Sequence, residues 1–182
     1  MPDLSDKEIL EQFRDPGQKE AAFRILLARY QERLYWHCRR LVTSHDDADD
    51  ALQNTLIKVW GNLDKFRADS GLYTWLFRIA TNESLTLLKQ KNKYNGSDDR
   101  EIDERVTENL SADEYFDGDE LQLKLQKAIQ SLPEKQRVVF NLKYYEEMKY
   151  EEMSRVLKTS EGALKASYHH AVKKIEKYLK DE

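Results

Sequence analysis

Apolar residues recur every three or four positions through most of the chain, and this period predicts amphipathic helices. Four such segments come first along the chain: residues 5–13, 23–41, 48–63 and 72–88. Asp46 or Asp47 stands where it could cap the third of these helices and favour the positive end of its dipole. The first half of the chain therefore predicts a lobe of four helices.

The last third of the chain shows the same period in shorter segments. One helix stops at Pro133, which also suits the first turn of the next helix. A short helix over residues 150–157, a polar turn and a longer helix then form the pattern of a helix-turn-helix. Ser160 is placed to cap the last helix by accepting a backbone N–H. No segment alternates as a strand does, so the sequence predicts an all-α fold.

Charge divides the chain into three parts. Residues 96–120 carry a net charge of −9, whereas residues 1–95 carry +1 and residues 121–182 carry +4. With so few apolar residues, the acidic segment cannot offset the entropy of ordering, and we interpret it as a flexible linker. The sequence thus predicts two small helical lobes joined by an acidic linker, and the overall charge of −4 hides a basic C-terminal lobe.

Composition excludes several classes of function. The single cysteine, Cys38, rules out a disulfide framework and a cysteine-rich metal site, and its place on an apolar stripe indicates a core thiol. No apolar run approaches the roughly 18 residues of a membrane span, and the first residues lack a signal pattern. Glycine-loop, HExxH and zinc-spacing motifs are missing. We expect a cytoplasmic protein that is neither an enzyme nor a membrane protein, without catalytic residues, cofactor or metal.

The last helix carries the first candidate binding surface. Its start could approach base edges in a DNA groove, and its polar face could meet phosphates. The candidate residues are Ser160, Glu161 and Ala163 near the start, and Lys165, Ser167, His169 and Lys173 along the face. A solvated face on an ordinary bundle helix would look the same, so spacing alone leaves both interpretations open.

The helix over residues 72–88 carries a second candidate surface. Trp75, Arg78 and Asn82 share a face outside the apolar stripe, and Lys89 continues it. An exposed ring can stack on a splayed base, an amide can read a base edge and cations can meet the backbone, so this face suits unpaired nucleic acid. The alternative is that the aromatic residues belong to the core.

The helix over residues 48–63 has a polar outer face with one apolar residue in it. The outward positions are Asp46, Asp50, Gln53, Asn54 and Ile57. A flat face of this kind suits the docking of another helix, although a solvated surface is the simpler explanation.

Together these three elements resemble the extracytoplasmic-function sigma factors of bacterial RNA polymerase. The resemblance rests on the stretches DDADDALQNTLIKVWGNLDKFR, FRADSGLYTWLFRIATN and LPEKQRVVFNLKYYEEMKYEEMSRVLKTSEGALKASYHHAVKKIEKYL. Their joint occurrence is more specific than any one motif, and the similarity covers residues 5–93 and 121–180, nearly everything except the linker.

The resemblance implies a transcription initiation factor that binds core RNA polymerase and confers promoter recognition and opening. Residues 1–95 would correspond to sigma region 2, with the helix of Asp46 docking on the polymerase clamp and the next helix holding the minus-ten element. Residues 121–182 would correspond to region 4, which reads the minus-thirty-five element. The resemblance adds Asp49 to the docking residues, Phe66 and Tyr73 to the minus-ten residues, and Thr159 to the minus-thirty-five residues. It also implies an anti-sigma factor as a partner.

The chain departs from the family at two places. Glu83, Ser84 and Leu85 follow Asn82, where the family usually carries a cluster of basic residues. In the last helix, histidines stand where an arginine is common. A stand-alone helix-turn-helix regulator, dimerising through the N-terminal lobe, is the main alternative, and an all-helical adaptor is a third. The face that carries Trp75 separates them, because a regulator that binds only duplex DNA does not need it.

Overall fold

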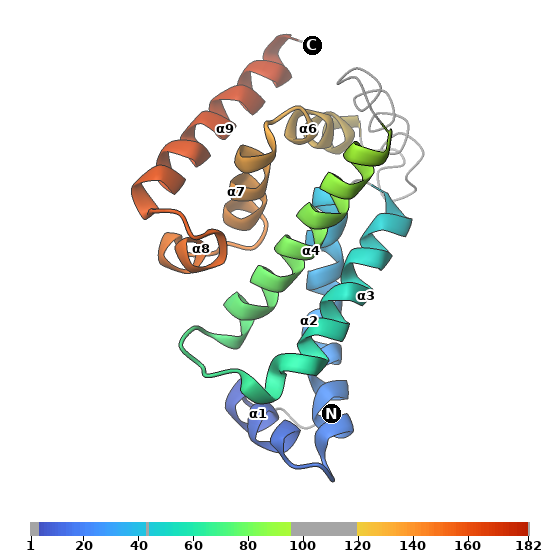
Figure 1. Cartoon of the computed structure of the whole chain (residues 1–182). Coiled ribbons are helices and arrows are strands. Elements are labelled where there is room, and N and C mark those ends of the chain that lie inside the picture. Colours follow the sequence, from blue (N-terminus) through green and yellow to red (C-terminus); the bar gives the residue numbers. More distant parts are fainter. Residues whose placement is uncertain (1–3, 43, 96–119, 182) are drawn as a thin grey trace.

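The computed structural model describes residues 4–42, 44–95 and 120–181, and over these residues it contains eight α-helices, one 3-10 turn and no strand. This confirms the predicted all-α fold of two helical lobes (Figure 1). The predicted linker, residues 96–120, lies outside the described residues except for Glu120, which begins a helix. No helix in the described part of the chain is long and apolar enough to cross a membrane.

The N-terminal lobe contains the four predicted helices. They are α1 (Asp6–Arg14), α2 (Lys19–Val42), α3 (His45–Asn62) and α4 (Leu72–Asn95), with the 3-10 turn η1 (Leu63–Lys65) after α3. The apolar stripes meet between the three long helices, where Leu26, Leu34 and Leu76 have no exposed surface. Figure 1 shows α2, α3 and α4 side by side, with α1 across one end. Burial of these leucines, worth roughly 1.5–3 kcal/mol each, holds the long helices together.

Serine residues cap the first and third helices. Ser5 caps α1 in a capping box, in which its main-chain N–H donates to Glu8 at 2.7 Å. Helix α3 is capped by Ser44, whose hydroxyl accepts from the N–H of Asp47 at 3.2 Å, so the predicted cap at Asp46 or Asp47 is wrong. The side chain of Asp47 instead pairs with Lys91 near the end of α4. Ser44 serves because it is the last residue with extended backbone before the helix.

The C-terminal lobe contains α6 (Glu120–Gln130), α7 (Glu134–Tyr144), α8 (Tyr150–Leu157) and α9 (Glu161–Asp181). Pro133 occupies the cap position of α7, one residue before the first turn. Lys158, with φ 52°, makes the sharp turn between α8 and α9. The hydroxyl of Ser160 accepts from the N–H of Ala163 at 3.3 Å, as predicted. Helices α8 and α9 thus form the expected helix-turn-helix.

The two lobes pack against each other. Val138, Val139, Met153 and Leu164 of the C-terminal lobe share one buried cluster with the core of the N-terminal lobe. A second, smaller cluster around Ile129 belongs to the C-terminal lobe alone. Figure 1 shows α8 and α7 facing α4. The sequence carries no signal for this contact, because the same apolar residues would serve an isolated lobe equally well.

Candidate protein and nucleic-acid interfaces

The outer face of α3 presents every residue predicted to dock on another protein. All six side chains are exposed: Asp46, Asp49, Asp50, Gln53, Asn54 and Ile57. Ile57 is 63% exposed in the middle of this polar face. Among the described residues, the main packing partners of α3 are α2, α4 and η1, and the exposure of these six side chains leaves its outer face open. The arrangement suits a helix-sized partner with basic residues opposite the aspartates.

A shallow groove between α2 and α3 extends this face. Its volume is about 420 Å³, and its lining is Phe23, Gln31, Asp49, Leu52, Gln53, Leu56, Ile57 and Trp60. Trp60, 37% exposed, stands with its ring edge-on to Phe23, at 5.0 Å between ring centroids. Sequence reasoning missed Phe23 and Trp60 as surface residues, although Trp60 follows Ile57 by three positions and so shares its face. An apolar floor with a polar rim is typical of protein interfaces.

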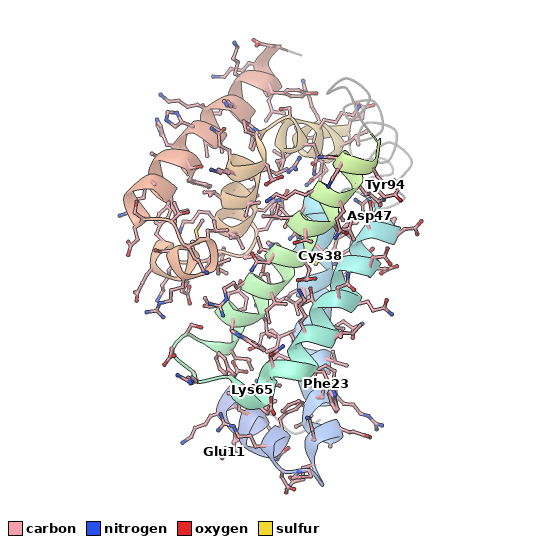
Figure 2. All side chains as sticks on the ribbon, in the orientation of Figure 1. Glu11, Phe23, Cys38, Asp47, Lys65 and Tyr94 are labelled. Carbon is pink, nitrogen blue, oxygen red and sulfur yellow. The ribbon has the colours of Figure 1, made fainter. Side chains whose placement is uncertain are left out.

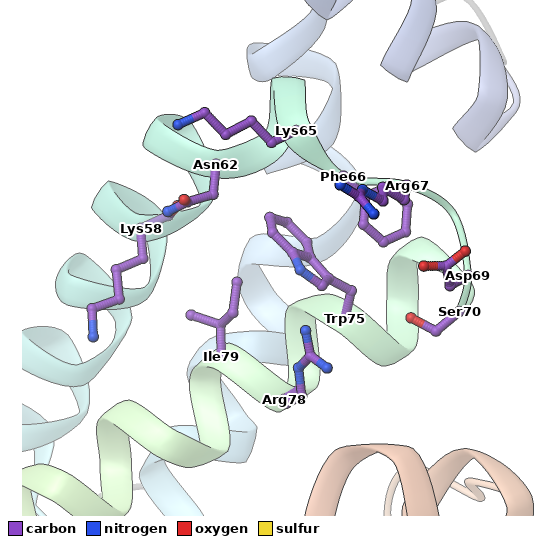
Figure 3. Close-up of a pocket in the computed structure, with 10 residues that line it drawn as sticks. All are labelled: Lys58, Asn62, Lys65, Phe66, Arg67, Asp69, Ser70, Trp75, Arg78 and Ile79. Atoms are coloured by element: carbon purple, nitrogen blue, oxygen red, sulfur yellow. The ribbon is translucent and has the colours of Figure 1, made fainter.

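A second surface lies where the segment after α3 meets the start of α4 (Figure 3). Here a pocket of about 450 Å³ is lined by Lys58, Asn62, Lys65, Phe66, Arg67, Asp69, Ser70, Trp75, Arg78 and Ile79. Three of the predicted minus-ten residues meet in it: Phe66, Trp75 and Arg78. Asn82 is exposed one helical turn beyond Arg78. The pocket therefore adds residues that sequence reasoning missed, six from the 58–70 segment and Ile79 from α4.

Trp75 differs from the prediction in its exposure. Its side chain is only 8% exposed and packs on Phe66, with 5.1 Å between ring centroids, so the expectation of an exposed ring is wrong. The reason is that the segment between η1 and α4 folds back over the start of α4, so that Phe66 packs on the indole. Figure 3 shows the indole forming one wall of the pocket beside Phe66 and Ile79. The ring can therefore line a base-sized space, but its faces are largely covered.

Positive charge surrounds this pocket. Lys58, Lys65, Arg67 and Arg78 contribute four cations to the lining, against the single carboxylate of Asp69. Lys58 also pairs with Glu83 of α4. Ala68, between Arg67 and Asp69, has φ 58°, a left-handed conformation that turns the chain sharply at this point. Such an excess of positive charge beside an apolar wall favours the binding of a nucleotide, whose base packs on the wall and whose phosphates meet the cations.

The remaining minus-ten candidates lie on the opposite side of α4. The hydroxyl of Tyr73 lies 3.3 Å from the carboxylate of Glu146 in the C-terminal lobe, and burial raises the pKa of this phenol. Lys89 lines a groove between the lobes. The predicted set is thus divided between two faces of α4, and in this structure Tyr73 and Lys89 face the other lobe.

The third surface is the start of α9 with the turn before it. Of the eight residues predicted there, Ser167 is half-buried and the others are exposed: Thr159, Ser160, Glu161, Ala163, Lys165, His169 and Lys173. Thr159, Ala163 and Ser167 line the same interlobe groove as Lys89, a space of about 420 Å³. This side of the predicted recognition helix therefore faces α4, while the side of His169 and Lys173 faces solvent.

The part of the chain that the structure describes holds neither a metal-binding cluster nor an exposed cysteine. No three residues among its histidines, cysteine and carboxylates stand where they could hold one ion. Cys38 is buried in the N-terminal lobe (Figure 2), where burial raises the pKa of its thiol to about 11. This confirms Cys38 as a core residue.

Comparisons with known proteins agree with the two-lobe division. The family model of Sigma-70 region 2 matches residues 26–94, and that of Sigma-70, region 4 matches residues 122–175. The ECF RNA polymerase sigma-E factor of Salmonella typhimurium is 30% identical over 183 residues, which covers 95% of this chain and 93% of that protein.

Two solved structures share the fold. CnrH in complex with the cytosolic domain of CnrY superposes with a TM-score of 0.71 at 24% identity, over 97% of this chain and 98% of that one. The sigma factor RpoE from Bartonella quintana, in complex with the anti-sigma factor NepR, gives 0.68 at 23% identity, over 87% and 96%.

Proposed function

The chain belongs to the extracytoplasmic-function sigma factors of bacterial RNA polymerase, and on this premise we propose which of its residues bind polymerase and promoter DNA. It is a transcription initiation factor that recognises promoters for core polymerase. The observation that carries this function is that models of two different sigma regions match the two lobes separately. A stand-alone helix-turn-helix regulator is not favoured, because such a regulator would not need the region 2 match.

Core polymerase docks on the outer face of α3 and on the groove beside it. The exposed side chain of Ile57 and the partly exposed ring of Trp60 supply apolar contacts. Asp49 and Asp50 attract basic residues of the partner. Because α3 resembles the family's clamp-binding helix, we infer that its partner surface is the clamp coiled coil of core polymerase. Phe23 supports Trp60 from α2 and belongs to the same site.

The pocket at the start of α4 holds a base of the opened minus-ten element. An unpaired base fits against the wall of Phe66 and Trp75, and Arg67 and Arg78 meet the neighbouring phosphates. Contacts of this kind contribute about 1–3 kcal/mol per base, which offsets part of the cost of melting. Asn82, one turn along α4, is placed to read the edge of the next base.

The C-terminal lobe, residues 121–182, binds duplex DNA at the minus-thirty-five element. The start of α9, from Ser160 to Lys165, enters the major groove, and His169 and Lys173 meet phosphates. Two lobes on one chain raise each other's effective concentration at a promoter, so each lobe can bind weakly alone.

We also propose an anti-sigma factor as a partner and the cytoplasm as the place of action. Both similar structures contain a bound second protein: CnrH binds the cytosolic domain of CnrY, and RpoE binds the anti-sigma factor NepR. Core polymerase is a cytoplasmic enzyme and carries the catalytic site, so this chain itself needs none.

Transcription in vitro tests the proposal. Purified core polymerase with this protein should give discrete transcripts from genomic DNA of the same source, whereas core polymerase alone should give none of them. Start-site mapping then reads the promoter elements directly. Transcripts that do not depend on the added protein would contradict the proposed function.

A further inference from the structure

The loop between η1 and α4 forms one wall of the pocket proposed to hold a base. This loop, residues 66–71, contributes four residues to the lining: Phe66, Arg67, Asp69 and Ser70. It has no helical structure, and Ala68 within it has φ 58°, a backbone conformation that a residue with a side chain seldom adopts. Such a conformation persists where neighbouring contacts hold it. The shape of the pocket therefore depends on what fixes this loop.

A side chain of α1 holds the first peptide unit of the loop. Arg14, the last residue of α1, donates from its guanidinium to the main-chain oxygen of Phe66 at 3.1 Å. The two residues are 52 positions apart in the sequence. The N–H of Phe66 donates to the main-chain oxygen of Leu63 at 3.3 Å, and its ring packs on Trp75. Phe66 is thus fixed by α1, by η1 and by α4.

The bonded oxygen belongs to the peptide unit that also carries the N–H of Arg67. Because a peptide unit is planar, a hydrogen bond to its oxygen fixes the direction in which the chain continues toward Arg67. The donor is a cation, and charge-assisted hydrogen bonds are stronger than neutral ones. Arg14 itself is not one of the residues that line the pocket. Any effect of Arg14 on the pocket therefore passes through Phe66 and Arg67.

Helix α1 gives this hydrogen bond a firm support. Ile9 and Phe13 are buried, and Ser5 and Glu8 form the capping box at its start. The helix packs on α2 and η1, and Figure 1 shows it at the end of the lobe where η1 lies. The match to Sigma-70 region 2 covers residues 26–94, so α1 precedes it. The region 2 match therefore assigns no role to α1.

We propose that Arg14 is a positioning residue of the base pocket, whose hydrogen bond to Phe66 keeps the loop in the shape in which Arg67 meets a phosphate of the opened strand. This inference rests on the proposed function, which assigns the opened minus-ten strand to this pocket. It extends the strand-binding machinery to α1, a helix that contributes no lining residue. Loss of Arg14 should then impair the capture of bases and leave the docking of polymerase on α3 intact.

The loop itself supplies the first test, on the free protein. Trypsin cleaves after Arg67 once the loop opens locally, and mass spectrometry of the fragments gives the rate. Arg14→Met keeps an unbranched side chain but removes the donor and the charge, and it should raise this rate about three- to tenfold. Arg14→Lys keeps a cation that can donate and should stay near the parent rate. Lys7→Met removes an exposed cation from the same helix and should match the parent protein.

Promoter opening by the holoenzyme supplies the second test. The promoters are those found by start-site mapping, and permanganate reactivity measures the opened fraction. Arg14→Met should reduce opening about three- to tenfold, whereas Arg14→Lys should retain most of it and Lys7→Met all of it. Polymerase affinity, measured in parallel, should be the same for the three variants and the parent protein. Circular dichroism melts establish that each variant is folded.

A merely structural role would not couple Arg14 to Arg67. Arg67→Gln removes the proposed phosphate contact and should itself reduce opening. If Arg14 acts through Arg67, Arg14→Met should have a smaller effect on opening in the Arg67→Gln background than in the parent protein. Two independent effects would instead multiply.

The outcomes separate this inference from the proposed function. An unchanged cleavage rate in Arg14→Met, unchanged opening, or an equal effect with and without Arg67 each overturns the role of Arg14. If Arg67→Gln impairs opening and Arg14→Met does not, the base pocket stands and only the role of Arg14 falls. Normal opening by Arg67→Gln removes Arg67 from the strand-binding site, and the role of Arg14 falls with it. Absence of promoter-selective transcripts with the parent protein overturns the proposed function, and the cleavage rates still decide whether Arg14 holds the loop.

Discussion

The two lobes differ in how they present their binding residues. The N-terminal lobe has its own core around Leu26, Leu34 and Leu76, and turns the outer face of α3 to solvent. The C-terminal lobe has a small core of its own around Ile129 and buries its other apolar residues against the N-terminal lobe. The N-terminal lobe therefore leaves a surface open to a partner, whereas the C-terminal lobe buries part of its apolar surface only while it is docked on the N-terminal lobe. The following predictions test this difference, from the largest expected effect to the smallest.

The core of the N-terminal lobe should be the most sensitive part of the protein. Leu34→Ala removes a side chain with no exposed surface and should lower the free energy of unfolding by about 2–5 kcal/mol. Denaturant melts followed by circular dichroism measure this. Ile57→Ala, which removes an exposed side chain of α3, is the control and should change stability by less than about 0.5 kcal/mol. Equal losses from both would contradict the division between core and docking face.

The docking face should show the reverse pattern for its exposed polar residues, because Asp50→Lys with Gln53→Ala should impair binding to core polymerase and preserve stability. Trp60→Ala should weaken the same binding by about 2 kcal/mol or more, and it also lowers stability because the ring packs on Phe13 and Phe23. Surface-bound polymerase and titrated protein give the affinities. Glu176→Lys makes the same charge reversal on exposed α9 and should leave polymerase binding unchanged. Normal holoenzyme formation by both docking variants would refute the assigned face.

Acid should weaken the N-terminal lobe through one buried histidine. Desolvation, with the nearby charge of Arg40, lowers the pKa of His37 in the folded protein to about 3. The unfolded chain binds a proton near pH 6.5, so stability falls as pH drops below about 6.5, by about 2 kcal/mol at pH 5. His37→Gln should lower this slope in melts between pH 7 and pH 5. Leu34→Ala, which is also destabilised but keeps His37, should retain the slope of the parent protein.

How far the sequence predicts this molecule depends on how local each feature is. The helical period of the apolar residues placed the helices correctly, because the spacing of apolar residues within each helix determines which side of it is buried. It failed for Trp75, whose burial depends on the segment before α4 folding back so that Phe66 covers the ring. Glu146 looks solvated in the run Tyr144-Tyr145-Glu146-Glu147, and only the docking of the lobes buries it. The groove at Trp60 could have been predicted from the sequence, since Ile57 and Trp60 are three residues apart and share a helix face.

The base pocket should affect promoter opening without affecting assembly. Arg78→Gln and Asn82→Ala each remove one proposed contact to the opened strand, and each should reduce opening by about 1–2 kcal/mol. Permanganate reactivity of the melted region reports on opening, and polymerase binding is measured in parallel. Arg78 is half-buried and Asn82 exposed, so neither change removes core volume, whereas Trp75→Ala would. Normal opening by both variants would argue against the pocket as the strand-binding site.

Two serine caps offer the smallest and most closely matched comparison between the lobes. Ser44 accepts from the N–H of Asp47 at 3.2 Å, and Ser160 accepts from the N–H of Ala163 at 3.3 Å. Alanine at either position should lower the free energy of unfolding by about 1 kcal/mol. The proposed roles differ, however, because only Ser160 stands at a DNA-binding face. Ser160→Asp keeps the cap and places a negative charge beside phosphate, so it should preserve stability while reducing duplex binding. Ser44→Asp should preserve both. If Ser160→Asp binds duplex as well as the parent protein does, the start of α9 does not approach DNA, and the C-terminal lobe must bind through the solvent-facing side of His169 and Lys173.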